Sequence, residues 1–396
     1  MTKITLVRKT SVKEGFDWFG PEMVLVYFWI LTIFIQAVSG FVFMIGAPSV
    51  VITLFIYSIM ALLLLLNINK LLKISICEIA IAIFMLLSFM ITMLFWPQNI
   101  EYMVNSIGVF ANCVLFFFSG RIYKYCENAE NLLYKASIIA LCLAYFAYFT
   151  SLAQTEKGMT FAYATLPSVV VIINYCVKYR RKLSVLAVVA GIVLLFLLGT
   201  RGPLLFSVIY LGYSLFKYIK GKFARLALVL AIALILWIVI NDIYIKWVED
   251  LYKWLLTKNI DSYILKQIVT ENSASLDERS NLSALLKESI NKNWLFGIGI
   301  FGDSILLGVY VHNIFLEILS GYGIIFGSML MIAMVVSLLY LFKRADKNDK
   351  EFIIILLFSY LLKLFVSSSF LIDTGFWFMV GILCGIFGKS KDNTNI

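Results

Sequence analysis

The single histidine of this chain, His312, is the side chain best suited to proton transfer near neutral pH. Asn313 follows it directly, and Glu317 lies about one helical turn further along. The three residues stand where a long hydrophilic stretch ends and an apolar stretch begins. This arrangement indicates a candidate acid or base at a membrane interface; the alternative is an interfacial histidine without a catalytic role.

Two arginines also stand out. Arg201 lies beside Gly202 at a tip between two apolar segments, where an arginine can also simply extend along apolar surface to water. Arg279 lies in the first turn of a helix that a capping-box spacing predicts from about 276 to 292, and the helix dipole disfavours a cation there. Its position suggests a negatively charged partner, although the neighbouring Glu278 would suffice.

Lys363 lies within an apolar stretch, where an ammonium group is costly unless it faces the protein interior or a hydrated cavity. We expect it either to pair with Glu317 or Asp373, or to bind an anionic group of a substrate.

Three glycines, Gly297, Gly299 and Gly302, precede the histidine and permit tight turns or close approach of a ligand. They do not follow a strand of a βαβ unit, so a dinucleotide-binding loop is a poor interpretation. We expect no metal ion and no cofactor, because one histidine and unpaired acidic residues supply too few ligands. The six cysteines lie in or beside apolar segments without metal or redox spacing, which argues against a disulfide.

The elements that must position these residues are membrane-spanning helices. Hydrophobic residues make up 62% of the chain and charged residues 14%, a balance that excludes a soluble globular fold. Apolar runs long enough to suggest crossings predict an all-α, polytopic membrane protein with about twelve transmembrane helices, in a single membrane domain over 1–396. The predicted spans lie near 24–46, 48–66, 74–95, 102–120, 136–153, 161–177, 183–199, 203–216, 226–243, 313–342, 351–372 and 374–388.

Basic residues predict the orientation of these spans. If the N-terminus is cytoplasmic, 23 of the 33 Lys and Arg residues fall in cytoplasmic segments, while the short outer loops hold only Lys157 and Arg201. Both termini are therefore expected in the cytoplasm. The net charge of +10 then reflects topology and attraction to anionic membrane lipid, and it gives no reason to expect a nucleic-acid partner.

One long hydrophilic stretch, 244–311, is predicted to be a large extracytoplasmic loop. Loops of this length tend to carry function. It begins with an amphipathic pattern in which Trp247 and Trp254 are expected to anchor a helix at the membrane interface.

Five blocks in order resemble the O-antigen ligase and polymerase family of bacterial membrane proteins. The blocks are Gly-Thr-Arg-Gly over 199–202, Glu278-Arg279, Trp-Leu-Phe-Gly-Ile-Gly over 294–299, His-Asn-Ile-Phe-Leu-Glu over 312–317, and Gly-Tyr-Gly over 321–323. The similar region runs from about 185 to 345. Thr200, Leu282 and Trp294 depart from residues that the family often shows, but none of them replaces a charged or titratable position.

The resemblance implies a glycosyltransferase with an architecture similar to the GT-C fold, in the bacterial cytoplasmic membrane. Its donor would be an undecaprenyl-diphosphate-linked oligosaccharide, used without metal or nucleotide. Because the leaving diphosphate gains negative charge, Arg201 and Arg279 are the expected catalytic cations, and His312 is expected to activate an acceptor hydroxyl. Residues expected in substrate binding or support are Asn313, Glu317, Gly202, Gly297, Gly299, Gly302 and Lys363.

Two reactions remain open within this family. A repeat-unit polymerase of capsule, exopolysaccharide or O-antigen type transfers the glycan to another lipid-linked unit, and a flippase and a chain-length regulator are then potential partners. A ligase transfers it to a different glycolipid or protein. The contrasting class is a transporter of lipid-linked sugars, which usually places polar residues at the bilayer midplane, where this sequence has only Lys363.

Overall fold

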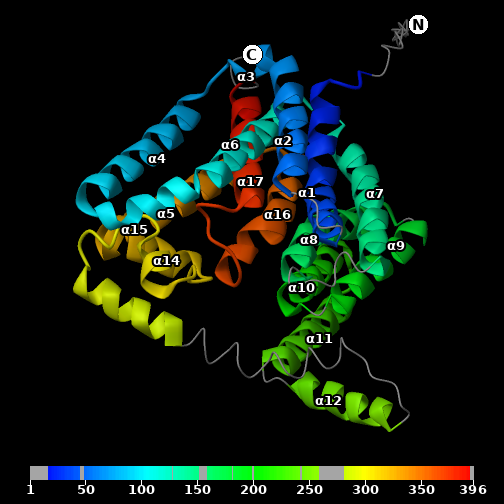
Figure 1. Ribbon diagram of the computed structural model, residues 1–396. Coiled ribbons are helices and arrows are strands. Elements are labelled where there is room, and N and C mark those ends of the chain that lie inside the picture. The colour runs from blue at the N-terminus through cyan, green and yellow to red at the C-terminus, as the bar shows by residue number, and fades with distance from the viewer. Residues whose placement is uncertain are drawn as a thin grey trace, which may run out of the picture.

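The computed structural model describes residues 17–44, 49–126, 128–150, 158–180, 182–198, 200–240, 243–257 and 281–392. Across these ranges the chain forms helices joined by turns and contains no strand, which confirms the all-α fold (Figure 1). The longer helices are α1 (Pro21–Met44), α2 (Ser49–Leu66), α4 (Ile76–Phe95), α6 (Ile107–Arg121), α7 (Ala129–Phe149), α8 (Gly158–Tyr179), α9 (Lys182–Leu197), α10 (Arg201–Tyr218), α11 (Lys222–Ile240), α12 (Ile243–Leu256), α15 (Ile314–Arg344), α16 (Lys347–Leu356) and α17 (Thr374–Asp392). Shorter elements are α3 (Ile68–Leu71), α5 (Ile100–Asn105), α14 (Gly302–Leu307), a helix over 281–292, and single turns at Pro97–Asn99 and Ile122–Tyr125.

Several of these helices can cross a membrane. Within the described ranges, five are long and apolar enough to do so: Ile76–Phe95, Ile107–Tyr125, Ala129–Phe149, Met159–Tyr179 and Ile314–Arg344. Their outer faces are apolar; Leu86 and Leu94 of α4, for example, are exposed. An exposed apolar surface of this extent suits contact with lipid. The structure supports an integral membrane protein, while the count of twelve spans stays a prediction.

The predicted span over 351–372 is wrong as a single α-helix. α16 ends at Leu356, a π-helical turn follows over Leu357–Leu361, and a 3₁₀ turn ends the segment at Phe365. The chain then turns back before α17 begins. Because the Lys363 ammonium group pairs with the Asp373 carboxylate, the intervening residues must fold into a compact turn instead of continuing outward.

α15 is also interrupted, although it lies where one span was predicted. Gly323 has non-helical dihedral angles (φ 78°, ψ 172°) inside it. The carbonyl of Ser320 accepts a hydrogen bond from the Ile298 N–H (2.7 Å), and the Ile324 N–H donates to the Trp294 carbonyl (2.6 Å). The segment from Trp294 to Ile298 thereby satisfies the backbone groups that the break would leave unpaired.

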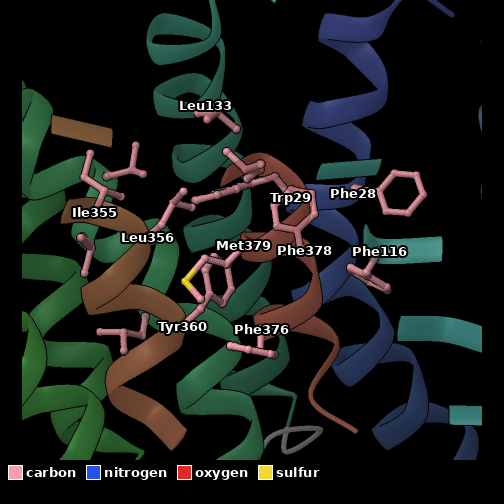
Figure 2. Close-up of a cluster of buried hydrophobic side chains, with 14 of the residues drawn as sticks. Phe28, Trp29, Phe116, Leu133, Ile355, Leu356, Tyr360, Phe376, Phe378 and Met379 are labelled. Carbon is pink, nitrogen blue, oxygen red and sulfur yellow. The ribbon is translucent and has the colours of Figure 1, made fainter. Parts of the chain in front are cut away.

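The core lies where α1, α6, α8 and α17 meet. Trp29 is fully buried there, and its indole N–H lies within hydrogen-bond distance of the hydroxyl groups of Ser137 (3.1 Å) and Ser168 (3.2 Å). Figure 2 shows its ring beside Phe378. The buried polar group of a large side chain thus finds partners on two other helices, which fixes α1 against α7 and α8.

The two ends of the molecule differ. The start of α1 and the end of α17 lie at one end, and α12 and the helix over 281–292 lie at the other (Figure 1). A buried ion pair stabilises the end that holds the start of α1. Arg121 pairs with Glu78 (2.7 Å) and also donates hydrogen bonds to the backbone carbonyls of Leu71 and Lys73. The two described helices of the long hydrophilic stretch that lie on either side of 258–280 are therefore opposite the first and last helix ends.

The predicted amphipathic helix at the start of this stretch is α12. Its Trp247, Leu251 and Trp254 are exposed, and Glu249 pairs with Lys253 on the polar side (2.7 Å). The second predicted helix is observed over 281–292, whereas 276–280 lie outside the described residues.

α6 and α17 approach each other so closely that only glycine fits between them. A Cβ atom on Gly120 would overlap the Phe378 carbonyl oxygen, and one on Gly381 would overlap the Phe117 carbonyl oxygen. Small residues at such contacts let helix backbones pack directly, which is a main source of stability between helices in lipid.

We predict that Gly120→Val destabilises the protein, because the new side chain would push the α17 backbone away. Overpacking of this kind typically costs about 1–3 kcal/mol. The measurement is thermal unfolding of the detergent-purified protein. Gly108→Val in the same helix is the matched control, since a Cβ there meets no atom within 4 Å; equal unfolding temperatures for the two variants would contradict this packing.

Candidate functional site

A cavity of about 280 Å³ lies where α8 begins and where the chain turns between α16 and α17. Its lining combines four tyrosine rings, several hydroxyl groups, one ion pair and apolar side chains such as Phe116 and Met159. The lining includes Tyr57, Thr160, Tyr163, Tyr310, Tyr360, Lys363, Ser367, Ser368 and Asp373. These residues come from four separate segments of the chain: α2, the start of α8, the residues before α15, and 360–373.

The ion pair of the cavity joins Lys363 and Asp373. The ammonium nitrogen lies 2.5 Å from the Oδ2 atom of the carboxylate, which also accepts from the Ser368 hydroxyl (2.7 Å). Its Oδ1 atom accepts from the Phe376 N–H (2.8 Å) at the start of α17. The ammonium group also lies 5.6 Å from the centre of the Tyr163 ring. Of the two carboxylates considered for Lys363, the structure thus pairs it with Asp373 and not with Glu317.

Arg201 and Gly202 lie directly behind a wall of this cavity. Arg201 is the first residue of α10 and is partly buried. A Cβ atom on Gly202 would overlap the hydroxyl oxygen of Tyr163, one of the lining residues. The absence of a side chain at 202 therefore lets the start of α10 rest against Tyr163, which brings the predicted arginine close to the cavity.

His312 lies beside another lining residue, Tyr310. Its ring is centred 4.4 Å from that of Tyr310, and the Tyr310 hydroxyl donates to the Ser367 carbonyl (3.3 Å). His312 has a left-handed backbone (φ 55°), which non-glycine residues rarely adopt and which is often found at functional sites. Tyr310 thus stands between the only imidazole of the chain and the cavity.

Asn313 has a clear local role. Its side-chain oxygen accepts hydrogen bonds from the N–H groups of Phe315 (3.0 Å) and Leu316 (3.3 Å), which makes it the N-cap of α15. The cap fixes where the membrane helix starts and therefore where the preceding His312 lies.

Glu317 does not contact His312 through any of its described hydrogen bonds. It is buried (5% exposed) and accepts from the Ser369 hydroxyl and from the Phe370 N–H (3.2 Å). It thereby joins α15 to the turn before α17. Its support for the site is indirect, because that turn also carries Asp373.

The three glycines shape the segment that leads to His312. Gly297 and Gly299 have left-handed backbones (φ 72° and 78°), and a Cβ on Gly297 would overlap the Ser320 carbonyl oxygen of α15. Asn99 donates to the carbonyls of Ile298 and Ile300 (3.0 Å each) on the other side. Gly302 has no such dihedral angle and opens the short helix α14.

Sequence reasoning missed Tyr163, Tyr310 and Asp303. Asp303 is buried and accepts from the Val311 N–H (3.4 Å), so it holds the residue before His312. Burial raises the pKa of the Asp303 carboxyl above its usual range. Asp303 could have been proposed from the sequence, because it is a carboxylate directly after the glycine segment. Nothing in the sequence spacing distinguished the two tyrosines.

Arg279, the other predicted catalytic cation, lies outside the described residues, as do Glu278 and the capping box. Within the described ranges no group of three His, Cys, Asp or Glu side chains could hold a metal ion. The expectation of chemistry without a metal stays a prediction.

We predict that Asp303→Leu destabilises the turn before α15, because the buried Val311 N–H would lose its acceptor, at a cost of about 1–3 kcal/mol. Asp303→Asn is the control: it keeps an acceptor oxygen, and the raised pKa indicates a site already unfavourable for the charged carboxylate. Thermal unfolding and protease cleavage of the purified protein measure the difference. Equal losses in both variants would assign the effect to the lost charge instead.

Comparison with known proteins places a family domain over one part of this site; of the cavity-lining residues named above, only Tyr310 lies within it. The family model described as O-antigen ligase matches residues 186–332, a range that includes Arg201, Gly202 and the segment from Gly297 to Glu317. Members of this family are glycosyltransferase-like enzymes, ligases or polymerases, that act on lipid-linked oligosaccharides in membranes. No curated protein and no solved structure matches the chain. The match supports the resemblance drawn from the five sequence blocks: residues 186–332, less than half of the chain, are similar to the O-antigen ligase family.

Proposed function

We propose that this protein is a polysaccharide repeat-unit polymerase of capsule, exopolysaccharide or O-antigen type. It transfers an oligosaccharide from an undecaprenyl-diphosphate carrier to a sugar hydroxyl of another lipid-linked unit, without a metal ion or a cofactor. The observation that supports this most is the juxtaposition at the cavity. The start of α10, with Arg201, touches one wall through Tyr163, and His312 contacts another through Tyr310.

The chemistry assigns a role to each of these residues. As the bond from the sugar to the diphosphate breaks, negative charge grows on the leaving phosphates, and Arg201 and Arg279 stabilise it. His312 accepts the proton of the acceptor hydroxyl as its oxygen attacks the sugar carbon. Asn313 positions His312 by capping α15, while Glu317 and Lys363 support the site through the turn before α17.

The arrangement suits an active site at the outer face of the bacterial cytoplasmic membrane. We infer about twelve spans in an architecture similar to the GT-C fold, with both termini in the cytoplasm and the loop over 244–311 outside. The location of α12 opposite the start of α1 supports this orientation (Figure 1). α8, α10 and α15 all begin near the cavity, so their N-terminal ends share the outer face in this topology.

The runner-up is a ligase that uses the same donor and a different glycolipid or protein as acceptor. The residues described here serve either reaction, because both need charge stabilisation at the diphosphate and a base at the acceptor. A transporter of lipid-linked sugars has less support. The expected midplane charge, Lys363, instead forms an ion pair with Asp373 at the turn before α17.

We predict that His312→Asn lowers transfer of the glycan by about 10² to 10⁴-fold, the usual contribution of a general base. Asparagine tolerates the left-handed backbone at position 312 better than alanine does, so the loss reports on the imidazole and not on backbone strain. The measurement is chain extension by the purified protein with lipid-linked repeat units extracted from a strain that lacks this gene.

Lys292→Ala is the control for this variant. Lys292 is exposed in the helix over 281–292 and pairs only with Glu288 among its described ion pairs. The Lys292→Ala variant should extend chains at the rate of the unchanged protein. Full activity of both His312→Asn and His312→Ala would remove His312 from the mechanism.

Deletion of the gene separates the two reactions. In a polymerase mutant, single repeat units should appear on the final acceptor, because attachment continues while extension stops. In a ligase mutant, long chains should accumulate on the lipid carrier. Electrophoresis of the cell-surface glycan together with mass analysis of the extracted lipid-linked pool distinguishes these outcomes, and long carrier-bound chains would overturn the polymerase assignment.

A further inference from the structure

The cavity that Tyr163 and Tyr310 help to line is lined by neither Arg201 nor His312. Tyr57, Tyr163, Tyr310 and Tyr360 contribute aromatic rings to it. Hydroxyl groups come from residues on α8 and on the turn before α17: Thr160, Ser367 and Ser368. Apolar faces next to many hydrogen-bonding groups suit a ligand that has both properties on one small ring.

The charge of the cavity is balanced. Among the described residues of the lining, Lys363 and Asp373 are the only charged ones, and they neutralise each other at 2.5 Å. A diphosphate would bring negative charge beside a carboxylate without a free cation in the lining to offset it, so it fits poorly here. A prenyl chain also fits poorly, because it would remove the ion pair and the hydroxyl groups from water without replacing their hydrogen bonds.

The ion pair still has hydrogen bonds to offer. The Lys363 ammonium has three N–H donors and gives one to Asp373, while the Asp373 carboxylate accepts three described bonds out of about four that it can accept. A group with hydroxyls at fixed spacing can use both. Hydrogen bonds to charged partners such as these discriminate well between ligands that have and lack a hydroxyl.

The size of the cavity limits the ligand. At about 280 Å³ it lies just below the roughly 300–1,000 Å³ that is usual for small-molecule pockets, so it accommodates one ring and not an oligosaccharide. Its position relates that ring to the chemistry, since Tyr163 contacts Gly202 next to Arg201 and Tyr310 contacts His312.

We propose that this cavity is a subsite for a single uncharged sugar ring, held by the Lys363–Asp373 pair and packed against Tyr163 and Tyr310. The proposal rests on the proposed function only for the origin of the ring, which is the reacting end of a lipid-linked glycan. Binding itself requires no transfer and can be tested separately.

The first test measures protection of a cysteine at the rim. Thr160 is exposed and lines the cavity, whereas Thr150, at the end of α7, is exposed, does not line it, and donates its hydroxyl to the Phe146 carbonyl (2.8 Å). Thr160→Cys and Thr150→Cys are treated with a maleimide, and labelling is read for each peptide by mass spectrometry so that the six native cysteines do not interfere.

The probes are the repeat-unit oligosaccharide released from its carrier by mild acid, and undecaprenyl phosphate without sugar. We expect the oligosaccharide to slow labelling of Thr160→Cys at least fivefold and to leave Thr150→Cys unchanged, and undecaprenyl phosphate to protect neither. No protection by the oligosaccharide, or protection of Thr160→Cys by undecaprenyl phosphate alone, would overturn the sugar subsite.

The second test fills the cavity from its rim. Thr160→Tyr should lower chain extension at least tenfold while the protein unfolds at the temperature of Thr150→Tyr, which should remain active. Extension by Thr160→Tyr at the rate of Thr150→Tyr would refute the subsite even if the unchanged protein is a transferase. Conversely, protection of Thr160→Cys in a protein that extends no chain would keep the subsite and reject the proposed function.

Discussion

In a hydrocarbon environment every backbone N–H and C=O group needs a partner within the protein, and this constraint governs how the site is built. Regular helices meet it alone, but a site needs turns. At Gly323 the helix α15 is interrupted, and the segment from Trp294 to Ile298 supplies a donor to the Ser320 carbonyl and an acceptor to the Ile324 N–H. The irregular backbone before His312 is therefore the partner of the irregular backbone within α15.

The same segment is held from its other side. Asn99 donates to the Ile298 and Ile300 carbonyls, and the Thr92 hydroxyl accepts from the Ile300 N–H (3.1 Å). Asp303 accepts from the Val311 N–H, and Asn313 caps α15. The residues on both sides of His312 are therefore held by hydrogen bonds. A left-handed residue persists only where its surroundings determine it in this way, and these contacts account for the backbone of His312.

Local patterns in the sequence were enough to predict the all-α fold, the amphipathic α12 and the residues that begin α15. The Gly-Thr-Arg-Gly motif and the glycine segment could be located from the sequence, because they are recognised by residue type alone. The partner of Lys363 could be narrowed to two carboxylates, and packing decided between them. The roles of His312, Arg201 and Arg279 in catalysis remain predictions.

What could not be predicted depends on contacts between distant parts of the chain. Tyr163 touches the site only because Gly202 leaves space for its hydroxyl, and Tyr310 reaches the cavity because the turn at Ser367 folds back. Both tyrosines look like ordinary aromatic residues in the sequence. The break of the span over 351–372 also escaped detection, because nothing in its apolar pattern marks the π-helical turn over Leu357–Leu361.

The hydrogen bonds that hold residues 294–302 from two sides have a consequence for the length of the segment before them. Because this segment is bonded to α15 on one side and to Asn99 and Thr92 on the other, the point where the long loop rejoins the bundle does not depend on the length of the loop. Doubling a flexible connection costs only about 0.6 kcal/mol in closure entropy. A longer connection before residue 281 would therefore leave Tyr310 and His312 in their places.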